Sequence, residues 1–84
     1  MALCIDIKTT DGRDASISFA RIERERNVVV LGAWVDGVPG DHVLTIGLDV
    51  LDMGNLWICL PGGAALEGAA ARRVADLVRA GAAS

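Results

Sequence analysis

The chain has 84 residues, enough for one domain with a thin core, since a chain this short buries only about 60–65% of the surface that its unfolded form exposes. Its hydrophobic fraction of 52% excludes disorder, while the aromatic fraction of 4% leaves Val, Leu, Ile and Ala to fill the core. A net charge of −3 offers no attractive field to a phosphate backbone, so we expect no nucleic-acid partner.

The compartment follows from what the sequence lacks. No apolar run approaches the ~20 residues that span a bilayer. Within residues 1–14 the first charged side chain is already at Asp6, which leaves too short an apolar run for a signal peptide. Cys4 and Cys59 are isolated and have neither the spacing of a metal knuckle nor that of a redox pair, which fits a reducing compartment. We therefore expect a cytoplasmic protein without a membrane partner.

The first half of the chain has the alternation of strands. Residues 2–8 alternate between apolar and polar side chains, and Asp11-Gly12 is a typical hairpin turn. Residues 15–22 alternate again, but Ile22 is out of phase, which predicts a bulge near Ala20 or Arg21. The charged segment that follows is expected to form a solvated hairpin tip that closes at Asn27.

Further strands are predicted in the middle of the chain. Residues 27–35 are almost all apolar, which is typical of a central strand buried on both faces. Residues 36–41 are rich in Gly, Pro and Asp and predict a loop. Residues 42–50 alternate with Leu44 to Val50 on the core face, and residues 56–60 form a last short strand before Pro61-Gly62-Gly63.

From residue 64 to residue 80 the apolar spacing becomes helical. One stripe holds Leu66, Ala70, Val74, Leu77 and Val78. Gly68 weakens the middle of this helix, and Gly81 is a plausible C-cap. The predicted fold is α+β, with residues 1–84 as a single domain: an antiparallel meander sheet of four to five strands (1–60) and one C-terminal amphipathic helix (64–80) packed on one face.

The strongest functional signal is apolar surface without an obvious cover. One helix covers one face of a sheet, whereas Trp34 and Trp57 project from the face opposite the main aliphatic set. Trp often dominates binding energy at interfaces, so we predict a partner-binding surface with Trp34 and Trp57 as anchors and Arg72, Arg73 and Arg79 as a charged rim. The alternative is that sheet twist brings both tryptophans into the core.

Catalytic and ligand-binding chemistry has little support. His42 lies among Asp36, Asp41, Asp49 and Asp52 in the sequence, but these residues lack a known metal-ligand spacing. Pro61-Gly62-Gly63 lacks the further glycines and the Lys of a phosphate loop. No Ser or Cys lies in a nucleophile-elbow motif. We therefore expect no enzyme, no cofactor and no metal.

Three functions remain as hypotheses. The first is a small non-enzymatic protein-binding module that inhibits a larger protein machine, as phage anti-defence proteins and immunity proteins do. The second is a homodimeric structural or assembly subunit whose uncovered sheet face pairs with its own copy. The third is a small ligand- or metal-binding domain that uses His42 and the neighbouring Asp residues of the loop region.

Overall fold

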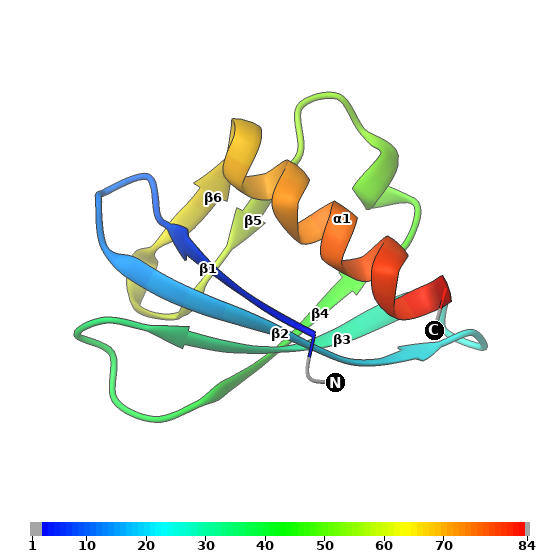
Figure 1. Ribbon diagram of the computed structural model, residues 1–84, viewed down its shortest axis with the longest axis horizontal. Coiled ribbons are helices and arrows are strands. Elements are labelled where there is room, and N and C mark those ends of the chain that lie inside the picture. The colour runs from blue at the N-terminus through cyan, green and yellow to red at the C-terminus, as the bar shows by residue number, and fades with distance from the viewer. Residues whose placement is uncertain (1–2, 84) are drawn as a thin grey trace.

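The computed structural model describes residues 3–83 and has two layers (Figure 1). The first layer, the main sheet, contains β1 (Cys4–Lys8), β2 (Asp14–Glu23), β3 (Val28–Val35) and β4 (His42–Gly47). The second layer contains a hairpin of β5 (Trp57–Cys59) and β6 (Ala65–Glu67) together with α1 (Gly68–Ala83). Both the hairpin and the helix lie on the same face of the main sheet, which we call the inner face (Figure 1).

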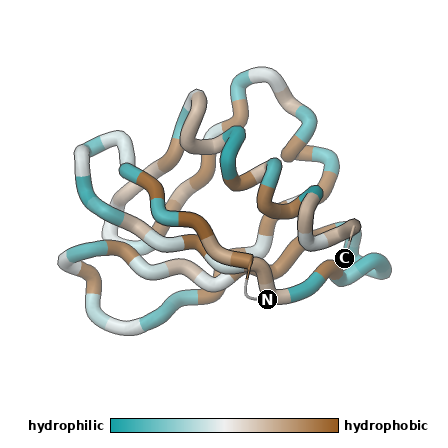
Figure 2. Tube along the Cα trace, in the orientation of Figure 1, coloured by the Kyte–Doolittle hydropathy of each residue, from teal (hydrophilic) through white to brown (hydrophobic). Residues whose placement is uncertain are grey.

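The main sheet is an antiparallel meander in the order β1-β2-β3-β4, as its sequence predicts. Apolar and polar residues alternate along β1, the foremost strand of Figure 2, because successive strand residues point to opposite faces. The register between β2 and β3 shifts between Phe19 and Arg21, which confirms the predicted bulge. The bulge returns Ile22 to the inner face, where it packs against the core.

The core fills the space between the two layers. Its six largest fully buried side chains come from β2, β3, β6 and α1, namely Ile17, Val29, Leu31, Val35, Leu66 and Val74. The helix buries the predicted stripe of Val74, Leu77 and Val78 against the sheet. The inner face is therefore the covered face, and the outer face of the main sheet has no second layer in the described part of the chain.

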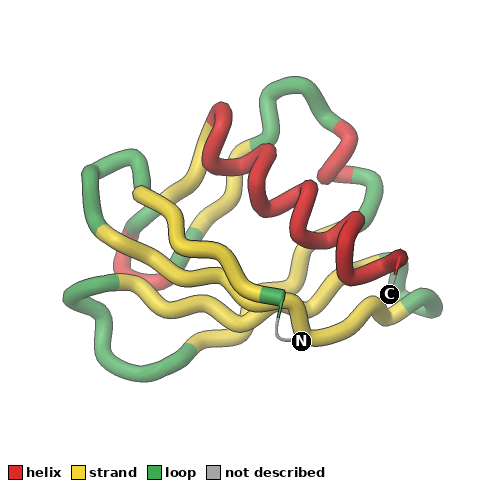
Figure 3. Tube along the Cα trace, in the orientation of Figure 1, coloured by secondary structure: helices red, strands yellow, loops and turns green. Residues whose placement is uncertain are grey.

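Residues 48–67 differ from the sequence prediction. The strand expected over 42–50 ends at Gly47, and Val50–Asp52 form the 3₁₀ turn η1. A second 3₁₀ turn, η2 (Pro61–Gly63), follows β5 (Figure 3). β5 does not extend the meander but pairs with β6, in the register Ile58↔Leu66.

The helix boundaries predicted as 64–80 were wrong, since α1 spans Gly68–Ala83. Leu66 fits the helical stripe, yet it is fully buried as a strand residue opposite Ile58. Gly68 begins the helix with a φ of +59°, a conformation that glycine adopts without strain, so it marks the strand-to-helix junction rather than the middle of the helix. Gly81 is buried within the helix and is not its C-cap. No described helix is long and apolar enough to span a bilayer.

Candidate functional site

The two tryptophans are both exposed but lie on different layers. Trp34, on β3, points to the outer face of the main sheet with 41% of its surface exposed, because its neighbours Ala33 and Val35 point into the core. Trp57, on β5, is 54% exposed and points away from the core, which its neighbour Ile58 enters. The alternative that both tryptophans fill the core is therefore wrong, and they do not share one patch.

The surroundings of Trp34 follow from strand register. Trp34 lies opposite Ser16 on β2, and Ser16 lies opposite Asp6 on β1. These three residues form one row across the outer face, in which the Ser16 hydroxyl donates to Asp6 Oδ1 at 2.6 Å. The next row runs from Cys4 on β1 through Ser18 and Gly32 to Val43 on β4, so its two interior positions hold only a small side chain or none.

Small residues leave a shallow hollow of about 360 Å³ beside the indole. We call it the outer-face hollow; it is lined by Ser16, Ser18, Gly32, Ala33, Trp34 and Asp41. A Cβ atom at Gly32 would lie 2.7 Å from Ser18 Oγ, so any larger residue there would begin to fill the floor. Val43, beside Gly32 on β4, is 74% exposed and adds an apolar neighbour.

The charge around the outer-face hollow is mainly negative. Asp41 lines it, and Asp6 lies one strand beyond Ser16; both are exposed. Two cations on this face already have acidic partners: Lys8 is paired with Asp14 at 2.7 Å, and Arg21 lies 3.8 Å from Glu23. An indole beside a carboxylate can bind a guanidinium or ammonium group through its ring face and through an ion pair.

None of the three arginines lines the outer-face hollow beside Trp34. Arg72 and Arg79 line a groove of about 210 Å³ between α1 and the loop that holds η1, which also contains Asp52 and Asp76. Arg79 is neutralised there by Asp76 at 2.9 Å and by Asp52 at 3.6 Å. Arg73 points elsewhere and donates to the main-chain oxygen of Asp6 at 2.8 Å.

The sequence region around His42 has no assembled metal site. His42 Nε2 lies 3.2 Å from the main-chain oxygen of Pro39. Within residues 3–83, no group of three or more His, Cys, Asp or Glu side chains could hold a metal ion. Cys4 and Cys59 are exposed free thiols, one on the main sheet and one on the hairpin.

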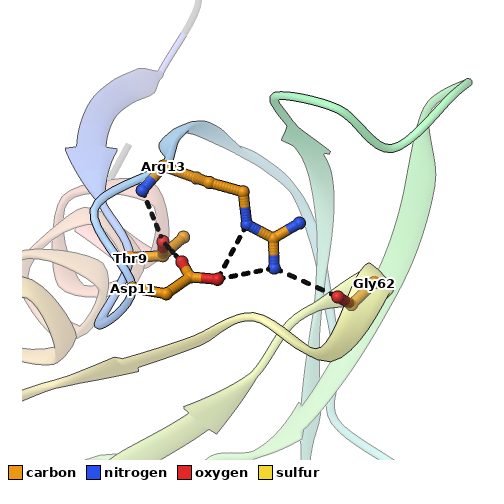
Figure 4. Close-up of polar contacts among 4 residues, drawn as sticks. All are labelled: Thr9, Asp11, Arg13 and Gly62. Carbon is orange, nitrogen blue, oxygen red and sulfur yellow. Dashed lines mark hydrogen bonds and ion pairs between the residues drawn. The ribbon is translucent and has the colours of Figure 1, made fainter.

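One polar cluster joins the two layers and was not found from the sequence (Figure 4). Thr9 donates to Asp11 Oδ1, and Arg13 donates from Nε to Asp11 Oδ2 at 2.9 Å and from Nη2 to the Gly62 oxygen at 3.0 Å. The hydrogen bonds from Arg13 and Thr9 lower the pKa of Asp11 from 3.8 to about 2. The cluster fixes the β1–β2 turn to η2, so we assign it a structural role.

The residues of the outer-face hollow other than Trp34 were missed as a group. Alternation places Ser16 and Ser18 on one face of their strand, but only the register across strands brings them beside Trp34.

Comparison with family models, with curated proteins and with solved structures gives no match to this chain. The function must therefore be argued from the surface itself.

Proposed function

We propose that this protein is a small non-enzymatic protein-binding module whose contact surface is the outer face of the main sheet around Trp34. The observation that supports this proposal is an exposed indole next to a hollow with a carboxylate in its wall, on a sheet face that no described element covers. Folded monomers bury most of their large aromatic side chains, and Trp is enriched among the residues that dominate protein interfaces.

The chemistry of the surface favours a basic partner segment. A guanidinium group seated in the outer-face hollow would stack on Trp34 and pair with Asp41, while an adjacent apolar side chain would contact Val43. The net charge of −3 adds long-range attraction for such a segment. Arg is the better fit than Lys, because a planar guanidinium stacks and pairs at once.

A module of this kind inhibits a larger protein when the basic segment that it covers is part of that protein's working surface. The inhibitory role needs only occupancy, since no catalytic step is involved. It is part of the same proposal, and it depends on the same contact with Trp34.

The proposal is tested with peptides selected for binding to the purified protein from a random display library. Selected peptides are expected to contain Arg next to an apolar residue. Trp34→Ala should weaken their binding at least ~30-fold, which corresponds to the ~2 kcal/mol typical of a dominant interface residue. Asp41→Asn should weaken binding less and should flatten its dependence on salt.

Trp57→Ala is the matched control, because it removes a more exposed tryptophan from the other layer. It is expected to leave peptide binding unchanged, and circular dichroism should show that both variants are folded. Peptides that bind Trp34→Ala as tightly as the wild type, or a selected set without basic residues, would contradict the proposal.

A further inference from the structure

The two edges of the main sheet differ in how they are protected. Strands β1 and β4 are the edges, and an edge strand presents unpaired backbone groups that can pair with another chain. Natural proteins block such edges with charged side chains, proline, bulges or covering elements. Only one of the two edge strands, β1, has such protection.

The β1 edge is blocked. β1 contains the charged residues Asp6 and Lys8, and Arg73 from α1 donates to the main-chain oxygen of Asp6 at 2.8 Å. Immediately after β1, the Thr10 amide donates to the Ala65 oxygen of β6 at 2.9 Å, so the hairpin closes that end. A further strand cannot pair along β1 without displacing these contacts.

The β4 edge is open. The sequence of β4, HVLTIG, contains no charged residue and no proline, and its pairing with β3 has no bulge. Among residues 3–83, no strand pairs with the other side of β4, and no main-chain group of a turn or loop bonds to its backbone. Leu44 and Ile46 face the core but are only half-buried, because β4 has a neighbouring strand on one side only.

We propose that β4 pairs antiparallel with β4 of a second copy of this chain, which joins two main sheets into one. A second copy is favoured by the absence of charge on β4: a two-fold axis places residues of β4 against residues of the same strand, so like charges along the strand would repel across the pair. His42–Gly47 contains none of the Asp, Glu, Lys or Arg residues that would make self-pairing unfavourable.

The register of this pairing is restricted. Directly opposed residues in an antiparallel pair point to the same face, so the two-fold axis must pass through a residue position rather than between two residues. An axis at Thr45 would place Asp41 opposite Asp49 of the second copy, whereas an axis at Leu44 places Asp41 opposite Gly47. The axis at Leu44 avoids that repulsion, and it pairs the exposed Val43 with Thr45.

The area involved predicts a weak dimer. A pair of six-residue strands falls well below the ~1,200 Å² that stable interfaces bury, so association should depend on protein concentration in the micromolar range or above. This inference does not rest on the function proposed for Trp34, because Trp34 is on β3; the residue that the two surfaces share is Val43 on β4.

The test is the solution mass, measured by light scattering on a concentration series from about 10 µM to about 1 mM. The wild type is expected to shift from monomer to dimer. Val43→Lys with Thr45→Lys should remain a monomer throughout, because both side chains are exposed on the outer face and place lysines on the edge. Ser18→Lys is the control, with an exposed lysine on the same face of an interior strand, and should dimerise like the wild type.

Cross-linking tests the register in a background with Cys4→Ser and Cys59→Ser. Leu44→Cys should form a disulfide dimer with diamide as the oxidant, because opposed Cα atoms in an antiparallel pair lie ~4.5–5.5 Å apart. Thr45→Cys should cross-link much more slowly, because its copy lies diagonally across the pair. A wild type that stays monomeric, or a dimer that is lost in Ser18→Lys but not in the β4 variant, would overturn the proposal, and so would cross-linking at Thr45→Cys alone.

Discussion

Replacing Gly81 with Ala tests the packing of α1 on the main sheet. A Cβ atom at this position would lie 2.5 Å from Phe19 Cδ1 and Cε1 and 2.6 Å from Cγ, about 1 Å closer than van der Waals contact allows. Overpacking of this kind costs about 1–3 kcal/mol, whereas Ala is about 1 kcal/mol better than Gly inside a helix. The ring of Phe19 is half-buried and can yield in part, so we expect a net loss of about 1 kcal/mol.

Thermal unfolding followed by circular dichroism measures this difference. A loss of about 1 kcal/mol should lower Tm by about 4–8 °C in a domain of this size. In a Phe19→Leu background, where the ring is absent, Gly81→Ala should instead be neutral or stabilising, because only helix propensity remains. A rise in Tm for Gly81→Ala in the wild-type background would refute the close packing of Phe19 on the helix.

Three further predictions concern stability. The pKa of Asp11 is lowered to about 2, so the stabilisation of the fold by its carboxylate is fully present above pH ~4 and is lost as the pH falls toward 2. Asp11→Asn should therefore reduce the change of the urea unfolding midpoint with pH, and only in that window. Leu66→Ala should cost about 2–5 kcal/mol in urea unfolding, because Leu66 is fully buried between the layers. Gly62→Ala should lower Tm more than Gly63→Ala, because both have positive φ but only at Gly62 would a Cβ collide with Val38.

The meander and its faces could be predicted from the sequence because each depends on neighbouring residues. Alternation in β1 and β2 predicts which side chains are buried, and the single phase error at Ile22 predicts the bulge. The tip at residues 24–27 follows from its charge, and Asn27 there has a φ of +54°, which Asn tolerates better than most residues. The amphipathic helix follows from the part of the predicted stripe that holds Ala70, Val74, Leu77 and Val78.

The strand predicted over residues 56–60 is confirmed as β5, but its pairing with β6 could not be predicted, because β6 has only three residues and Leu66 fits a helical and an extended pattern equally well. The strand is favoured by its partner, because Leu66 pairs with Ile58 and closes the core. Gly68 supplies the positive φ at the junction, so the helix begins four residues after the predicted start at residue 64.

For the candidate site, the direction of each tryptophan could be predicted from the sequence, but its neighbours could not. Local alternation is enough to predict that Trp34 and Trp57 point away from the aliphatic side of their strands, because that direction depends only on a period of two residues. That they lie on different layers, that Arg72, Arg73 and Arg79 are absent from the lining of the outer-face hollow, and that Ser16 and Asp41 lie beside Trp34 depends on the tertiary structure. The physical reason is that periodicity fixes the direction of a side chain from its own strand, whereas its neighbours depend on strand pairing and layer packing between residues far apart in the chain.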